Sequence, residues 1–225
     1  AKKARENLFD AFALIGSYSD EGFQHITETE DIVDKYEDKL GTYLIHITSR
    51  ELNSEQNEAV GKYLHTINDF ERISDHALNV AECAQELHEK GIVFSEDAAR
   101  EVNVLISAVT EVMNTAIDAF CNNDLENAYR VEPLEELIDN LCDEMKLHHI
   151  DRLQKGICTL NHGFVFNDLI TNLERISDHC SNIAVAIIEL ESDSFDTHEY
   201  INSLIEVRSH CFDEYYAEYS KKFVL

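Results

Sequence analysis

The chain contains one charged hexapeptide twice, Glu-Arg-Ile-Ser-Asp-His, at Glu71–His76 and again at Glu174–His179. Apolar positions around the two copies repeat at the same offset of 103 residues, as Phe70 and Leu173 do. A charged segment that recurs together with its apolar surroundings indicates an internal duplication rather than ordinary core patterning. The sequence therefore predicts two halves that fold alike.

Residues that break helices are scarce, because the 225 residues include one proline and seven glycines, while long runs carry apolar residues at helical spacing. The predicted fold class is all-α: a tandem pair of three-helix bundles plus a C-terminal seventh helix, divided into residues 1–92, 93–192 and 193–225. Thr27 and Glu30 have the spacing of a capping box, so the second helix is expected to begin there. The expected helices are residues 4–23, 27–47, 54–91, 95–121, a fifth that carries Pro133 and ends near Gln154, 161–189 and 197–223.

Charge and composition exclude several classes of function. The formal net charge of −27 would repel a phosphate backbone, so a nucleic-acid partner is not expected. No apolar stretch reaches the roughly 20 residues that span a bilayer. The six cysteines lie far apart without a Cys-x-x-Cys pair, which predicts reduced, packed thiols rather than a zinc finger. Cys180 in particular is expected to be a small buried hydrophobe.

Both halves contain acidic pairs in the same register. A glutamate followed four residues later by an aspartate places two carboxylates on one face of a helix. The chain has six such pairs, and four of them match between the halves at offsets of 103 or 105 residues. The matched pairs, which are the predicted metal ligands, are Glu30 with Asp34, Glu71 with Asp75, Glu135 with Asp139, and Glu174 with Asp178.

Side-by-side packing of the two acidic helices of each half would bring four carboxylates into one volume. Such charges must raise their pKa values, pair with cationic side chains or bind metal. Arg72 and Arg175 can each pair with an aspartate three positions on, but one arginine does not balance four acids. We therefore predict one metal cluster in each half. The alternative, a solvated acidic face in a chain with 45 acidic residues, is disfavoured by the matched register.

Two histidines and two asparagines of the repeat are weaker candidates. His76 and His179 could add imidazole ligands, but each points about 100° away from the preceding aspartate, which favours a hydrogen-bonded histidine at a helix interface. Asn79 and Asn182 can hold water, metal or a neighbouring backbone. Carboxylate oxygens suit iron, manganese, magnesium, calcium or zinc, so the ligand type narrows the metal only partly.

The context Leu-Glu-Arg-Ile-Ser-Asp-His-x-x-Asn, together with the paired acids, resembles the PhoU family over about Lys3–Glu191. The resemblance implies tandem three-helix bundles in which the four acid pairs named above hold multinuclear clusters of divalent or trivalent metal, namely iron, zinc, manganese or nickel. The repeat is imperfect, since Glu82 is matched by Val185, so the two clusters could differ in metal content.

The family resemblance also implies control of phosphate uptake without enzymatic activity. PhoU-like domains occur as free-standing regulators and as the cytosolic C-terminal part of bacterial sodium/phosphate cotransporters. The expected aromatic helix at 197–223 and a start at Ala1 rather than methionine favour the cotransporter domain, located in the cytoplasm at the inner membrane. Its expected partners are the membrane domain of the transporter or phosphate-signalling proteins, and a homo-oligomer is compatible with it. The free-standing regulator is the alternative.

Two other classes of protein compete with this interpretation. A carboxylate-bridged diiron oxidase is built with Glu-x-x-His ligands, and no histidine here has a glutamate three residues before it. The second competitor is a helical adaptor whose surface acids bind nothing. Metal analysis of the purified chain and its acid-pair variants would separate the adaptor from a metal-binding regulator.

Overall fold

The structure, a computed structural model, describes residues 1–192 and 211–225, apart from the side chains at positions 55, 58, 191 and 192. Within these residues six long helices are followed by a helix at 211–222, and no strand is present, which confirms the all-α prediction. The six are α1 (Lys2–Gly16), α2 (Asp20–Thr48), α3 (Ser54–Lys90), α4 (Glu96–Asn122), α5 (Leu125–Gln154) and α6 (Leu160–Ser192).

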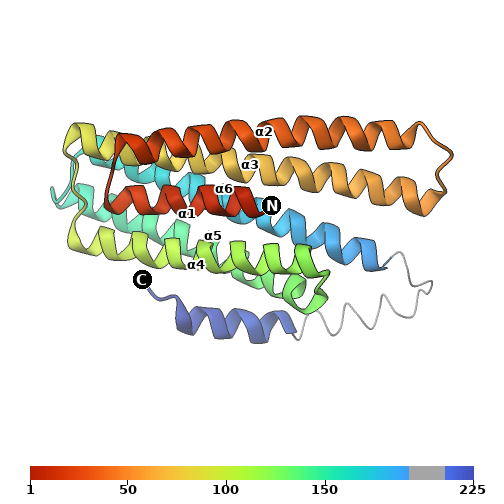
Figure 1. Ribbon diagram of the computed structural model, residues 1–225. Coiled ribbons are helices and arrows are strands. Elements are labelled where there is room, and N and C mark those ends of the chain that lie inside the picture. Colours follow the sequence, from red (N-terminus) through yellow and green to blue (C-terminus); the bar gives the residue numbers. More distant parts are fainter. Residues whose placement is uncertain (193–210) are drawn as a thin grey trace.

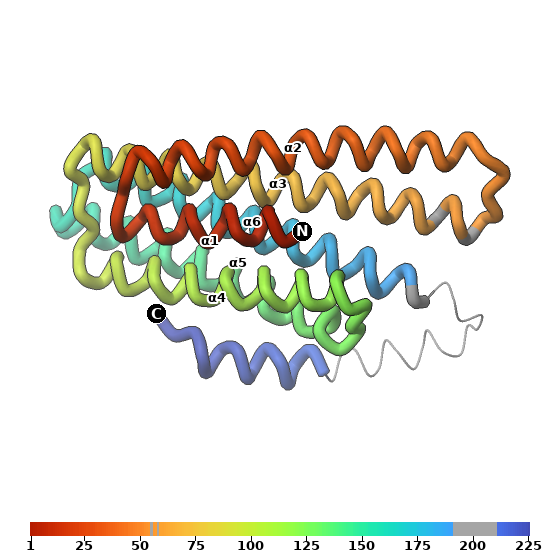
Figure 2. Tube along the Cα trace, viewed as in Figure 1, coloured from red at the N-terminus to blue at the C-terminus, as the bar shows by residue number. Residues whose placement is uncertain are grey.

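The helices form two three-helix bundles that lie side by side along one axis (Figure 1). α3 and α6 pack against each other in the centre, with α1 and α2 against α3, and α4 and α5 against α6. The trace in Figure 2 shows α2 and α3 continuing well past the N-terminal end of α1, whereas α4 accompanies α5. The far ends of α2 and α3 therefore lack a third helix among the described residues, and Tyr36, Tyr43 and Ile45 are exposed there.

The second helix begins earlier than predicted. Ser19 is the N-cap of α2, and its hydroxyl oxygen accepts a hydrogen bond at 3.1 Å from the backbone N–H three residues on. The predicted capping box at Thr27 and Glu30 is wrong, because the Thr27 hydroxyl donates to the Phe23 carbonyl inside the helix. Residues 17–19 make a connection too short to interrupt the apolar periodicity, so the sequence pattern did not reveal the break.

Most other helix boundaries follow the sequence signals. Asn53 caps α3 in a capping box with Gln56, and Gly91 ends that helix in the left-handed conformation with φ +60°. Ser95 caps α4, whose C-cap Asn123 also has positive φ. Each residue type is favoured at the position it takes, so these boundaries lie close to the predicted ones.

α4 is the one described helix that is long and apolar enough to cross a membrane by length and composition. This differs from the expectation that no segment would reach that length. Its side chains Val102, Leu105 and Val109 are buried in the bundle core. A helix packed on two neighbours requires an apolar composition of this kind, so the composition is explained by the bundle itself.

A polar network related by the duplication lies between α3 and α6. His76 Nδ1 donates to Asn172 Oδ1 at 2.9 Å, and His179 Nδ1 donates to Asp69 Oδ1 at 2.9 Å. Asp69 and Asn172 occupy equivalent positions of the two halves, and the two imidazole rings stack with centroids 5.6 Å apart. Asn182 also donates to Asp69, at 3.2 Å. The two histidines thus link the halves, as the prediction of hydrogen-bonded interface histidines required.

The core uses equivalent residues of both halves. Ile73 on α3 and Ile176 on α6 carry the same letter of the repeat, and both are 0% exposed. Cys180 is also fully buried, which confirms its predicted role as a small hydrophobe. Burial of matched side chains fixes which face of each central helix points away from the core, and that face carries the acids.

The C-terminal helix packs on the second bundle. Within residues 211–222, Tyr219 is buried, and the guanidinium of Arg130 on α5 lies 4.5 Å from the ring centroid of Tyr215. The remainder of the predicted seventh helix, residues 197–210, lies outside the described residues. The aromatic residues at its C-terminal end therefore contribute to the fold of this chain.

Candidate metal centres

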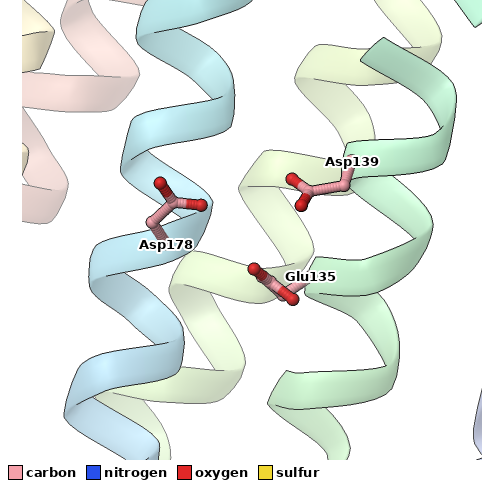
Figure 3. A group of neighbouring side chains, drawn as sticks. All are labelled: Glu135, Asp139 and Asp178. Carbon is pink, nitrogen blue, oxygen red and sulfur yellow. The ribbon is translucent and has the colours of Figure 1, made fainter. Parts of the chain in front are cut away.

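Three carboxylates of the second half converge between α5 and α6 (Figure 3). Glu135 and Asp139 lie one turn apart on α5, and Asp178 faces them from α6. Each contributes one oxygen to a group whose oxygens all lie within 4.8 Å of one another. Carboxylate oxygens bind hard cations at 2–2.6 Å, so this spacing allows one ion to contact all three.

The same carboxylates disfavour each other's ionised form. Burial, followed by the charges of Asp139 and neighbouring acids, raises the pKa of Glu135 to about 7. Burial, followed by Asp178 and Glu174, raises the pKa of Asp139 to about 6. Asp139 Oδ1 is buried without a hydrogen-bond partner among the described residues. A cation would supply that partner and offset the repulsion, so the donor set fits a metal ion.

Glu174, the fourth predicted ligand of this cluster, is engaged by a lysine. Lys146 Nζ donates to Glu174 Oε2 at 2.8 Å and lies 3.5 Å from an oxygen of Asp143. Asp178 accepts a hydrogen bond at 2.9 Å from Arg175 Nη1, the pairing that the sequence predicted. The second cluster therefore has three carboxylates within reach of one ion and a fourth held by Lys146.

The four predicted acids of the first half also act on one another, from α2 and α3. Burial, followed by Asp75 and the neighbouring carboxylates, raises the pKa of Glu30. Burial also raises the pKa of Glu71, an effect that Arg72 opposes and that Asp75 and Asp34 increase. Acids from both helices thus share one electrostatic environment, as the duplication predicted.

This first cluster is more open than the second. Asp34 is exposed, whereas its counterpart Asp139 is half-buried. Among the described residues, no three carboxylates of the first half come within the spacing that the second cluster reaches. Arg72 lies 3.7 Å from a Glu71 oxygen and 3.6 Å from an Asp75 oxygen, both longer than the direct contacts in the second half. The eight predicted residues are thus gathered in two groups of different compactness.

Two charged residues beside the second cluster were missed by the search for acid pairs. One is Lys146, and the other is Glu132, whose Oε2 accepts a hydrogen bond at 2.7 Å from the Ser181 hydroxyl. The offset of 105 residues that aligns the acid pairs matches these positions with Gly41 and Thr27. Extending that alignment along the whole helix would have found both differences.

The clusters are separate from the enclosed space elsewhere in the molecule. A cavity of about 740 Å³ is lined by residues of α1, α3 and α4, including Phe12, His88 and Val102. None of the eight acids lines it. The carboxylates therefore form surface-accessible centres at helix interfaces and are not part of that cavity.

Comparison with known proteins places the chain in a family. The PhoU domain family matches residues 1–84 and 102–187. The chain is 25% identical over 191 residues to the phosphate-specific transport system accessory protein PhoU homolog 1 of Thermotoga maritima, covering 83% of this chain and 80% of that protein. It is 20% identical over 189 residues to a PhoU homolog of Clostridium acetobutylicum that bears the same accessory-protein name, covering 83% and 85% respectively.

The fold has a close structural counterpart. The crystal structure of PhoU from Pseudomonas aeruginosa matches with a TM-score of 0.80 over 85% of this chain and 91% of that one, at 23% sequence identity. At that identity the similarity supports the fold alone. Because the family match spans most of both halves, the chain belongs to the PhoU domain family.

Proposed function

We propose that this chain is a non-enzymatic regulator of phosphate transport that acts in the cytoplasm as a PhoU-type accessory protein and carries metal at two carboxylate clusters. The observation that carries the proposal is the matched set of acid pairs in both halves of a PhoU family member. The relatives from T. maritima and C. acetobutylicum are named as accessory proteins of a phosphate-specific transport system. We extend that role to this chain, with components of a phosphate transport or signalling system as its partners.

A free-standing accessory protein is preferred over the cytosolic domain of a sodium/phosphate cotransporter. The chain covers 80% and 85% of the two curated relatives, and both are accessory proteins. The aromatic C-terminal helix, which motivated the cotransporter hypothesis, packs on α5 through Tyr215 and through Tyr216, which accepts a hydrogen bond from Asn140. That helix therefore gives no reason to invoke a membrane domain.

In this proposal each bundle holds metal between two of its helices. Glu135 and Asp139 from α5 and Asp178 from α6 would hold an ion in the second bundle. Bound metal supplies positive charge that joins carboxylates of two helices. Because it binds the folded chain and removes like-charge repulsion, it stabilises the arrangement that a partner recognises. The ligands of the two clusters are Glu30, Asp34, Glu71 and Asp75, and Glu135, Asp139, Glu174 and Asp178.

The donor atoms favour manganese or iron among the candidate metals. Within the described residues, no imidazole or thiolate joins the group formed by Glu135, Asp139 and Asp178. Carboxylate oxygens suit manganese, whereas zinc and nickel more often take nitrogen or sulfur ligands. The same all-oxygen set differs from the Glu-x-x-His ligands of diiron oxidases, which disfavours that alternative.

Deletion of the gene in its host tests the regulatory role. The deletion strain is expected to lose the adjustment of phosphate uptake that follows a shift between scarce and abundant phosphate, and the wild-type gene should restore it. Unchanged uptake after deletion would refute the regulatory role. Complementation with Asp139→Asn plus Asp178→Asn, with exposed Lys155→Ala as the matched control, tests the metal. Full rescue by a metal-free double variant would leave regulation standing and remove the metal from it.

A further inference from the structure

We propose that Lys146 acts as a built-in cation that limits the second cluster to a single metal ion, whereas the first cluster, which has no such lysine, takes more than one. The inference rests on the proposed metal binding and concerns how the two halves divide it. It assigns to one residue outside the acid pairs the control of metal stoichiometry.

The position of Lys146 carries the first step. Its Nζ donates to Glu174 Oε2 at 2.8 Å, and its side chain is only 33% exposed. An ammonium in direct contact with a carboxylate supplies positive charge where a second ion would otherwise supply it. A second ion bound to Glu174 would also lie beside that ammonium and be repelled by it. Glu174 is therefore withheld from metal, and the ion-binding group contracts to Glu135, Asp139 and Asp178.

The first half lacks this device at the equivalent positions. The offset of 105 residues matches Lys146 with Gly41 and buried Cys142 with Glu37. Glu37 is close enough to contribute to the raised pKa of Glu71, the counterpart of Glu174. At this end of the cluster the first half thus has one carboxylate more and one ammonium fewer. Its greater uncompensated negative charge favours additional cations.

An extra acid at the other end of the second cluster does not cancel this difference. Glu132 lies one turn before Glu135, on the side away from Lys146, and accepts a hydrogen bond from Ser181 at 2.7 Å. Its charge adds to the group around Glu135 rather than to Glu174. The negative charge of the second cluster is therefore concentrated around the place where three oxygens already converge, which suits one ion.

The test counts ions in each cluster separately, with Mn²⁺ as the probe because it prefers oxygen ligands. Asp34→Asn with Asp75→Asn leaves only the second cluster in the full-length chain. In that background we expect about one Mn²⁺ per chain, rising to about two when Lys146→Met is added. Lys146→Arg is the matched control: it keeps the charge and should keep the count. Bound Mn²⁺ is obtained from the electron paramagnetic resonance signal of the free ion.

The reverse substitution provides a second, independent variant. An added side chain at Gly41 meets only Glu37 Oε1, at 3.9 Å, so Gly41→Lys fits the helix. With the second cluster disabled by Asp139→Asn and Asp178→Asn, Gly41→Lys should lower the count of the first cluster from about two Mn²⁺ to about one, and Gly41→Ala should not.

The outcomes separate this inference from the proposed function. Counts that change with the charge at positions 146 and 41 support it. Counts that ignore both substitutions overturn it while leaving metal binding intact. Absence of bound Mn²⁺ even in the wild-type chain refutes metal binding, and the stoichiometry inference with it. Circular dichroism identifies any variant that fails to fold, and Gly41→Lys then decides the matter if Lys146→Met is the one that fails.

Discussion

The two acidic clusters share one repeated pattern but leave different amounts of charge uncompensated. In the first, Asp34 is exposed and the nearest cation is Arg72, more than 3.5 Å from either acid it faces. In the second, Asp139 is half-buried with an unpartnered oxygen, while Lys146 directly neutralises Glu174. The duplication therefore reproduces the position of the ligands, and residues one or two turns away determine how strongly each cluster attracts metal.

The comparison assumes that the two halves rest on equivalent cores. Replacing either Ile73 or Ile176, both fully buried, with alanine should lower the free energy of unfolding by about 2–5 kcal/mol. The two losses should be similar because both side chains lie on the central helices. Urea denaturation measures them. A large loss in one half with almost none in the other would show that the scaffolds are not equivalent.

The next effect is a pH dependence located mainly in the second cluster. The folded-state pKa of Glu135, about 7, and that of Asp139, about 6, lie above their ordinary values, so the folded chain binds more protons than the unfolded chain between those values. Without metal, these groups should therefore make stability fall as pH rises from about 4.5 to about 7.

Denaturation in the presence of a chelator at several pH values checks this prediction. Glu135→Gln should flatten the slope, whereas the exposed Asp34→Asn should change it less. Excess Mn²⁺ should reverse the trend, because the ligands must be deprotonated to bind metal. Equal slopes in the wild type and Glu135→Gln would remove the proposed contrast between the clusters.

A single neutralising substitution should stabilise the metal-free second cluster more than the first. Asp139→Asn removes a half-buried charge and is expected to raise stability at neutral pH by about 1 kcal/mol, a figure discounted for solvent screening. Asp34→Asn should have little effect because that side chain is exposed. Thermal unfolding without metal provides the measurement. An equal gain from both substitutions would mean that burial does not distinguish the clusters.

The smallest expected effect is loss of the lysine contact. In the metal-free chain, Lys146→Met leaves Glu174 without its direct partner and should cost about 0.5 kcal/mol, since both side chains are partly exposed. Lys155→Ala removes a more exposed ion pair with Asp151 and should cost less. Chemical denaturation compares them. A gain in stability on losing Lys146 would contradict its role as the compensating charge.

Much of this architecture is predictable because its signals are local and repeated. Cap residues such as Asn53, Ser95 and Gly91 place most helix boundaries, and the repeat locates the acid pairs. The start of α2 was mispredicted because Ser19 caps a helix across a connection of only a few residues. That failure arises from a local competition between two plausible caps.

The contrast between the clusters could not be predicted from the acid pairs alone. Lys146 and Glu174 are 28 positions apart, and their contact depends on the packing of α5 against α6. The unpartnered oxygen of Asp139 likewise depends on burial by neighbouring helices. Sequence identifies which side chains share a helix face, whereas the distances across a helix interface come from the fold.

Metal counting in cluster-specific variants tests the central claim most directly. The metal-free wild type and three variants would be titrated with Mn²⁺: Asp34→Asn with Asp75→Asn, Asp139→Asn with Asp178→Asn, and all four substitutions together. Each double variant should lose the ions of its own half and keep those of the other, and the quadruple variant should bind none. A quadruple variant that binds as much Mn²⁺ as the wild type would show that these acid pairs are not the metal sites.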